Sequence, residues 1–317
     1  MFDMNNEKIV PRIAVLIPCY NEEVVIAAVV RDFRAALPDA KIYVFDNNSS
    51  DRTMAVAQEA GAIVRSVKQQ GKGNVVRRMF ADIEADAYVL VDGDDTYHAA
   101  SAHDMVAKLL KENLDMVVSR RETEEVAAYR PGHRFGNWVL TEFVARLFGR
   151  AFTDILSGYR VFSRRFVKSF PALAIGFEIE TELTVHALEL RMPIEEVSAP
   201  YKSRQEGSVS KLNTYRDGIR ILWMILKLFR LERPLSFFGG IGALLGLAAL
   251  VLAMPLWLTY AETGLVPRFP TAILVTGMAL TGFLSLACGL ILDTVTQGRR
   301  EMKRLAYLQI APPRMDS

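Results

Sequence analysis

The sequence predicts an α/β protein in which a mostly parallel sheet, with helices on both faces, is followed by an amphipathic helix and two C-terminal transmembrane helices. Val- and Ile-rich runs alternate with helical stretches in the N-terminal part, an alternation typical of parallel sheets. Two long runs without charge then occupy residues 235–260 and 269–292. The expected division is a soluble domain over 1–212, a juxtamembrane helix over 213–233 and a two-helix region with a tail over 234–317.

The elements of the soluble domain follow from this alternation. Short apolar runs rich in β-branched residues are typical of strands buried on both faces. Such strands are expected at residues 13–17, 42–45, 63–67, 88–91 and 116–118. Helices are expected between them at residues 22–37, 51–60, 73–84 and 99–111.

The two uncharged runs are each long enough to cross a hydrocarbon core of roughly 30 Å as a helix. Their glycines would let the two helices approach closely. A pair of buried core helices is the alternative interpretation. The mean hydropathy of +0.16, high for a chain that is 23% charged, favours the membrane interpretation.

Cations at the outer ends of the two runs predict the topology. They are Lys227, Arg230 and Arg233 before the first run and Arg299, Arg300, Lys303 and Arg304 after the second. The positive-inside rule then places both ends, and the soluble domain, in the cytoplasm. We therefore expect a multi-pass protein of the inner (plasma) membrane. The amphipathic stretch 214–233 is expected to lie on the headgroups of membrane lipids.

Composition excludes several classes of function. A formal net charge of +2 gives no cationic excess for nucleic-acid binding. Cys19 and Cys288 lie in different contexts, so neither a disulfide framework nor a cysteine zinc site is expected. The four histidines lack metal-ligand spacing.

Polar clusters follow the predicted strands at residues 18–23, 46–51 and 92–96, and a further cluster opens the third helix at 70–74. Ligands of open α/β sheets bind at the carboxyl ends of the strands. Asp92 and Asp94 flank Gly93, and two such carboxylates can converge on one hard cation that keeps positions open for diphosphate oxygens. An acidic turn that caps a helix is the alternative for this motif.

A second group of residues suits an anionic ligand. It comprises Arg120, Arg121, Arg130 and Arg134, then Ser157-Gly158-Tyr159-Arg160, and then the Gly/Ser-rich stretch 203–211 with Arg204 and Lys211. Guanidinium forks match phosphate oxygens in shape and charge. Solvated surface charges are the alternative explanation for any one of these arginines.

With these motifs the sequence resembles family 2 of the inverting glycosyltransferases, which have a GT-A fold, and within it the polyprenyl-phosphate glycosyltransferases, the group of dolichyl-phosphate mannose synthase and bactoprenol glucosyltransferases. The resemblance implies a donor site formed by Pro18, Tyr20, Glu22, Asp46, Lys72, Asp92, Gly93 and Asp94. It implies an acceptor-phosphate site formed by Arg120, Arg134, Ser157, Arg160, Arg204 and Lys211. Asp92, Asp94 and Arg204 would be the catalytic residues.

The resemblance also implies a cofactor and partners. Asp92 and Asp94 would bind Mg²⁺ or Mn²⁺, and Thr96 stands where the family often has a Gln, so a third protein ligand is not assured. The donor would be a UDP- or GDP-sugar and the acceptor undecaprenyl or dolichyl phosphate. A homotetramer is expected by the same resemblance.

The predicted function is therefore inverting transfer of a sugar from a nucleotide-diphosphate sugar to a polyprenyl phosphate, for cell-envelope glycan synthesis or modification. The sequence carries no Asp near Glu178, Glu180 and Glu182, where many family members have a general base. A lipid phosphate is already an anion and needs no such base. Two alternatives stay open: a hydroxyl acceptor on a glycolipid or polysaccharide, and a non-catalytic membrane scaffold with a degenerate nucleotide pocket.

Overall fold

A computed structural model of the chain describes residues 10–122, 142–146, 154–176, 178–202, 223–224 and 226–311. The chain divides into two compact units. The first consists of Met1–Gly218 and Lys303–Ser317, and the second of Ile219–Met302.

The first unit contains a seven-stranded sheet with the order β3-β2-β1-β4-β6-β5-β7. The strands are β1 (Ile13–Cys19), β2 (Lys41–Asp46), β3 (Ile63–Ser66), β4 (Ala87–Leu90), β5 (Met116–Glu122), β6 (Arg160–Ser163) and β7 (Ile194–Pro200). The five strands expected from sequence are confirmed, while β6 and β7 were not predicted. Because β6 runs antiparallel to both β4 and β5, the sheet is mixed.

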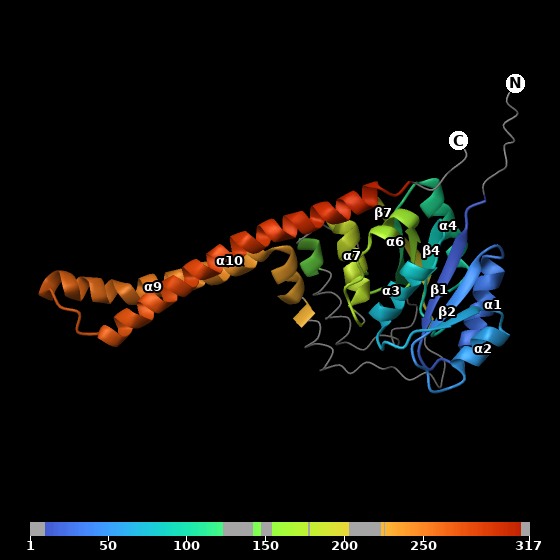
Figure 1. Cartoon of the computed structure of the whole chain (residues 1–317), viewed down its shortest axis with the longest axis horizontal. Coiled ribbons are helices and arrows are strands. Elements are labelled where there is room, and N and C mark those ends of the chain that lie inside the picture. The colour runs from blue at the N-terminus through green and yellow to red at the C-terminus, as the bar shows by residue number, and fades with distance from the viewer. Residues whose placement is uncertain are drawn as a thin grey trace, which may run out of the picture. The chain divides into compact units, whose positions relative to one another are not determined.

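Helices cover both faces of this sheet, as predicted (Figure 1). On one face lie α1 (Ile26–Ala36), α2 (Thr53–Glu59) and α4 (Ser101–Lys111). On the other lie α3 (Lys72–Asp82), α6 (Arg164–Ser169) and α7 (Ile179–Glu189). The alternation of side chains along a strand separates the two cores. Val89 of β4 packs with α1 and α4, whereas its neighbour Tyr88 packs against Phe80 of α3.

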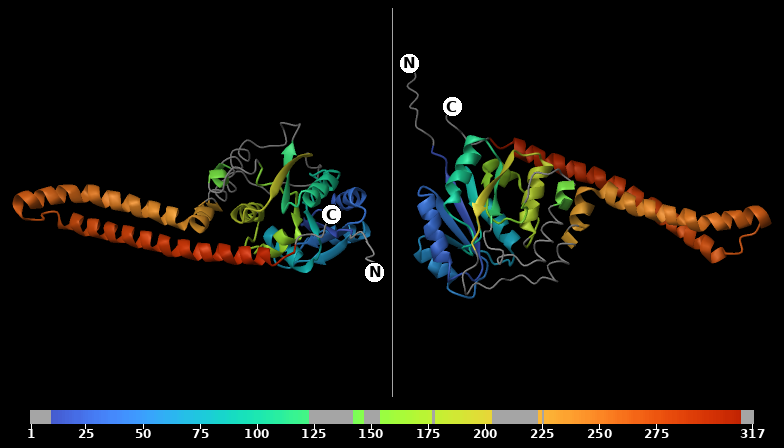
Figure 2. Two further views of the ribbon diagram at one scale, coloured as in Figure 1. Left: turned by 90° about the horizontal axis from the view of Figure 1, so that it is seen from above. Right: turned by 180° about the vertical axis from the view of Figure 1, so that it is seen from behind.

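The second unit is dominated by two long antiparallel helices, α9 (Pro234–Thr263) and α10 (Phe269–Leu308), which lie side by side in every view (Figure 2). The most apolar windows of the two helices are only 6% and 11% buried, so the described part of the chain does not enclose them as core helices. Both are long and apolar enough to span a membrane.

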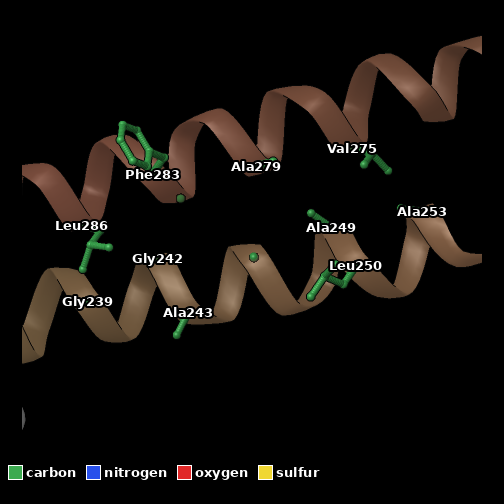
Figure 3. Close-up of a pocket in the computed structure, with 12 residues that line it drawn as sticks. Gly239, Gly242, Ala243, Ala249, Leu250, Ala253, Val275, Ala279, Phe283 and Leu286 are labelled. Atoms are coloured by element: carbon green, nitrogen blue, oxygen red, sulfur yellow. The ribbon is translucent and has the colours of Figure 1, made fainter.

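Small residues bring α9 and α10 together. A Cβ on Gly242 would lie 2.7 Å from the carbonyl oxygen of Gly282, so no larger side chain fits at this crossing. Figure 3 shows the groove beside it, where Ala249 and Val275 point toward one another from the two helices. This close approach is the role expected for the glycines of the two uncharged runs.

Helix α10 continues well beyond the predicted end of the second span at residue 292. Its last turns belong to the first unit. Lys303 Nζ lies 2.6 Å from a carboxylate oxygen of Glu189, and the Tyr307 hydroxyl donates to Asp115 over 2.7 Å. From Lys303 to Leu308 the helix is therefore an ordered part of the first unit.

Candidate active site

The carboxyl ends of β1, β2 and β4 lie next to one another because these three strands are parallel neighbours. Cys19 pairs with Asp46 at the ends of β1 and β2, and the backbone N–H of Asn47 donates to the carbonyl of Cys19 over 2.9 Å. Asp92 follows β4 at the same edge. The topology thus brings three of the predicted polar clusters together.

The Asp92-Gly93-Asp94 turn fits closely against its neighbours. A Cβ on Gly93 would lie 2.5 Å from Cys19 Sγ, and one on Gly158 would lie 2.3 Å from Asp92 Oδ2. Only glycine fits at either position without a shift of these groups. Two glycines distant in sequence therefore determine where the Asp92 carboxylate lies.

Lys72, at the start of α3, reaches into this site. Its Nζ lies 2.5 Å from Asp92 Oδ1 and also contacts Glu180 Oε1 of α7. Burial disfavours the charged ammonium, but the carboxylates of Asp92 and Glu180 outweigh that effect and raise the pKa of Lys72. Burial raises the pKa of Asp92, which the ammonium of Lys72 opposes. The result is a carboxylate–ammonium–carboxylate arrangement at the end of β4.

The turn that carries Lys72 is held by backbone packing. A Cβ on Gly73 would lie 2.2 Å from the carbonyl oxygen of Ala174, and Gly71 adopts a φ of 125°, a conformation that favours glycine. Glu182 accepts hydrogen bonds from the backbone N–H groups of Leu173 and Ala174 over 2.9 and 2.7 Å. Glu182 thus orders the loop against which the Lys72 turn packs.

Asp94 is 6% exposed and is held by Thr96, whose Oγ1 donates to Asp94 Oδ1 over 2.6 Å. The residue in the place of the family's Gln therefore positions the carboxylate. Among the described residues, no group of three His, Cys, Asp or Glu could hold a metal ion. The carboxylates of Asp92 and Asp94 nonetheless suit a hard divalent cation whose other ligands are phosphate oxygens and water.

Asp46 and Asn47 follow β2 and have different roles. Asp46 is 1% exposed; its Oδ2 accepts from the Ser49 N–H over 3.0 Å, while its Oδ1 is buried without a hydrogen-bond partner in the described part of the chain. Asn47 donates to the carbonyls of Val67 and Gln69 and accepts from the Gly71 N–H over 2.7 Å. Asn47 therefore ties the end of β2 to the Lys72 turn, a role that sequence reasoning did not assign.

The residues predicted from the first strand lie at its end and in the loop that follows it. Pro18 pairs with Phe45 inside the sheet, and Tyr20 is 37% exposed just beyond it. The backbone N–H of Glu22 donates to Thr53 Oγ1 over 2.9 Å. The loop after β1 is thus fastened to the start of α2 next to Asp46.

The structure corrects two of the predicted acceptor residues. Arg160 is 0% exposed, and its guanidinium donates to the carbonyls of Ser157 and Ile155 over 2.9 and 2.6 Å and to Thr184 Oγ1 over 2.8 Å. Burial lowers its pKa to about 10. Ser157 is also fully buried. Neither side chain faces solvent, so both support the backbone around Gly158 and are not available to an acceptor phosphate.

The remaining predicted acceptor residues are only partly described. Arg120 is exposed at the end of β5, where its guanidinium donates to Ser198 Oγ over 2.7 Å. Its neighbour Arg121 forms a bidentate pair with Asp154 over 2.6 and 2.9 Å. Arg134, Arg204 and Lys211 lie outside the described residues.

Glu180 is the functional candidate that sequence reasoning missed. It is 6% exposed; its Oε1 contacts Lys72, and its Oε2 is buried without a partner in the described part of the chain. The local sequence has three glutamates at alternate positions, 178, 180 and 182, which do not distinguish it. The signal is its contact with Lys72, which only the fold creates.

Comparison with known proteins gives a consistent result. The family model described as Glycosyl transferase family 2 matches residues 14–170. The glycosyltransferase AglJ of Haloferax volcanii is 32% identical over 304 residues, 94% of this chain and 98% of that protein. An uncharacterized Shigella flexneri protein is 58% identical over 154 residues, 49% of this chain and 94% of its own length. The dolichyl-phosphate hexose transferase of Haloferax volcanii is 26% identical and covers 70% of this chain and 95% of its own length.

Solved structures are similar to about two thirds of the chain. One is the glucosyl-3-phosphoglycerate synthase of Mycobacterium tuberculosis in complex with Mn²⁺, uridine diphosphate and phosphoglyceric acid. It has a TM-score of 0.57 and 25% identity, covering 69% of this chain and 78% of that one. The predicted GT-A type fold is therefore confirmed.

Proposed function

Because the chain belongs to glycosyl transferase family 2, we propose that it transfers a sugar, with inversion, from a UDP- or GDP-sugar to the phosphate of a polyprenyl phosphate. One observation carries the donor half of the proposal. Lys72 contacts both Asp92 and Glu180, so a cation lies beside the first carboxylate of the Asp92-Gly93-Asp94 turn. A cation next to a carboxylate pair is the arrangement that a diphosphate and its divalent metal require.

The donor would lie along the ends of β1, β2 and β4. Asp92 and Asp94 would hold Mg²⁺ or Mn²⁺, which neutralises charge on the departing diphosphate. Lys72 would add a second positive charge to the same phosphates. The unpartnered Oδ1 of Asp46 is suited to accept an N–H of the nucleobase, because a buried acceptor gains most from the hydrogen bond it lacks. The Mn²⁺ complex of the similar synthase supports divalent-metal use.

The acceptor half rests on the relatives and on the two apolar helices. The name of the 26% identical dolichyl-phosphate hexose transferase points to a polyprenyl-phosphate acceptor. A phosphate monoester is anionic near neutral pH, so it can attack C1 of the sugar without a general base. Arg120 and, by resemblance, Arg134, Arg204 and Lys211 would bind that phosphate. The enzyme's main contribution would be orientation of the two substrates and stabilisation of the leaving group.

The proposed setting is the inner membrane. Helices α9 and α10 would span it with the first unit in the cytoplasm, where nucleotide sugars are found, and a homotetramer is proposed from the family resemblance. The product would be a polyprenyl-phosphate-linked sugar for cell-envelope glycans.

A transfer assay tests the proposal. The purified full-length protein is incubated with radiolabelled UDP- and GDP-sugars, with and without undecaprenyl phosphate, and label is followed into the organic phase. We expect transfer that requires the lipid phosphate and yields a mild-acid-labile product. Transfer to a glycolipid or polysaccharide hydroxyl alone would favour the hydroxyl-acceptor alternative. Nucleotide binding with no transfer to any acceptor would favour the scaffold.

An Arg204→Ala variant separates the acceptor from the donor. Loss of one charge-assisted contact to phosphate should weaken catalysis with the lipid by roughly ten- to a hundred-fold. Calorimetry should show nucleotide-diphosphate binding close to that of the unaltered protein. Lost nucleotide binding with normal lipid kinetics would place Arg204 at the donor instead.

A further inference from the structure

The second unit contains a cavity whose lining includes none of the residues proposed for the donor or acceptor site. It lies between the start of α9 and the later part of α10 and has a volume of about 270 Å³. Arg230 and Arg299 contribute guanidinium groups to its lining, and Phe238, Leu292 and Val295 contribute apolar surface. All of the residues that line it belong to the second unit. The cavity is therefore composed of residues separate from the candidate active site.

The charges around this cavity are unbalanced. Glu232, which is 6% exposed, is paired with Arg299 and Arg300 over 3.2 Å each. The Nε of Arg299 is nonetheless buried without a hydrogen-bond partner in the described part of the chain. Arg230 is exposed and has no ion pair among the described residues. A buried N–H donor without an acceptor is costly, so this donor favours an acceptor from outside the chain.

The other carboxylates of this part of α10 do not supply that acceptor. Asp293 accepts from Gln297 Nε2 over 3.0 Å, and Glu301 is exposed. Neither lines the cavity. Lys227 adds a further exposed cation on the segment before α9 without lining the cavity itself.

We propose that this cavity binds the headgroup phosphate of an anionic phospholipid. Guanidinium forks bind phosphate oxygens in two-point fashion, and basic pockets between membrane helices are suited to anionic headgroups. The cavity lies at the end of α9 and α10 where their uncharged segments meet their cations, which is the depth of a lipid headgroup. Phe238, Leu292 and Val295 provide the surface for the first part of an acyl chain.

A polyprenyl phosphate shares this chemistry, so the experiment distinguishes the two sources. The full-length protein is released from detergent for native mass spectrometry after titration with phosphatidylglycerol, phosphatidylcholine or undecaprenyl phosphate. We expect a phosphatidylglycerol adduct that phosphatidylcholine does not give. Arg230→Gln should weaken that adduct about tenfold, as for loss of one charge-assisted contact. Lys227→Gln is the matched control, since it removes a nearby charge that does not line the cavity, and it should leave the adduct unchanged.

Two checks make the result decisive. Thermal unfolding of both variants should match that of the unaltered protein. Arg299→Lys, which keeps the positive charge but removes the two-pronged guanidinium, should also weaken the adduct. Equal weakening by Lys227→Gln would show diffuse charge attraction and overturn the proposal. An adduct with undecaprenyl phosphate alone, lost in Arg230→Gln, would overturn it in favour of the acceptor. These outcomes do not depend on whether the protein transfers sugar, because no donor is present.

Discussion

At the scale of single residues, the position of Lys72 between two carboxylates would allow one site to serve both the metal and the diphosphate proposed above. A buried charge is tolerated only when it is paired. If Asp92 were the sole partner of Lys72, a divalent cation that takes Asp92 would leave the ammonium uncompensated. Glu180 provides a second partner, because it contacts Lys72 from α7 and is itself buried. We infer that Glu180 would keep Lys72 in place when the Asp92 carboxylate binds the metal.

The first prediction concerns Glu180. Glu180→Gln removes a charge-assisted contact of about 1.5–3 kcal/mol, so kcat should fall roughly ten- to a hundred-fold. The KM for the polyprenyl phosphate should change little, since Lys72 is proposed to act on the donor. Glu178→Gln is the control: Glu178 is exposed on the same segment and accepts from the Gly176 N–H. A Glu180→Gln enzyme with normal kcat and an altered lipid KM would contradict the assignment.

The second prediction is metal dependence at Asp94. Chelation should abolish transfer, and Mg²⁺ or Mn²⁺ should restore it. Asp94→Asn should lower kcat by about a hundred-fold or more, the size expected when a group that stabilises transition-state charge is removed. Electron paramagnetic resonance should show weakened Mn²⁺ binding in this variant, while its thermal unfolding stays close to normal. Full activity of Asp94→Asn in EDTA would refute the metal site.

At the scale of elements, the sequence predicts those parts that obey one local pattern. Strands β1 to β5 follow the pattern of short apolar runs, and two of the polar clusters predicted beside them contribute Lys72 and Asp92, which contact each other. Strand β6 was missed because it begins with Arg160. An arginine is usually expected at an exposed position. Arg160 is nonetheless fully buried, because two backbone carbonyls and the Thr184 hydroxyl accept hydrogen bonds from its guanidinium. Such partners come from other elements, and no local pattern reveals them.

The same limit applied to the site. Glu180 and Lys72 are 108 residues apart, and their contact exists because α3 and α7 share one face of the sheet. The carboxylate pair of Asp92 and Asp94 was predictable because it is local and follows a strand. Asp92 and Asp94 could therefore be predicted from their shared motif, whereas Glu180, which is distant in sequence, could not.

The third prediction concerns the packing of α6 against α7. His186 of α7 is 1% exposed, lies against Phe166 and Phe170, and pairs with Ser169 Oγ over 3.1 Å. Burial, with a smaller effect from Lys303, lowers its pKa to about 3. In the unfolded chain the His186 imidazole binds a proton below about pH 6.5, whereas in the folded chain it stays neutral. The free energy of unfolding therefore falls as the pH drops below about 6.5.

The size of this effect can be measured. His186 should cost about 2 kcal/mol of folding free energy at pH 5 relative to pH 8. Thermal unfolding of the full-length protein, followed from pH 8 to pH 5, should therefore decline more steeply than that of His186→Gln. The Gln variant has no group to protonate, so the difference in slope isolates His186 from the carboxylates that also titrate. Parallel slopes would show that folding does not lower the pKa of His186.

At the scale of the whole molecule, α10 connects the second unit to the first. Its last turns belong to the first unit through Lys303 and Tyr307, and the first unit also precedes α9 in the chain. Both ends of the α9–α10 pair are thus attached to the same folded body. If these two helices cross a membrane, a hairpin that begins and ends in one unit has both of its ends on the same side. The cations that flank the two helices then predict that this side is the cytoplasm.

The last prediction combines that connection with the flanking cations: residues 264–268, between α9 and α10, should face the outside of the cell. Cys19 is buried and Cys288 is exposed, so a Cys288→Ser variant should show little labelling of its own. Val266→Cys should react with a membrane-impermeant maleimide in intact cells. Glu301→Cys, exposed near the other end of α10, should react only after permeabilisation. Labelling of Glu301→Cys in intact cells with Val266→Cys protected would place the candidate active site outside, away from cytoplasmic nucleotide sugars, and would contradict both the topology and the proposed donor.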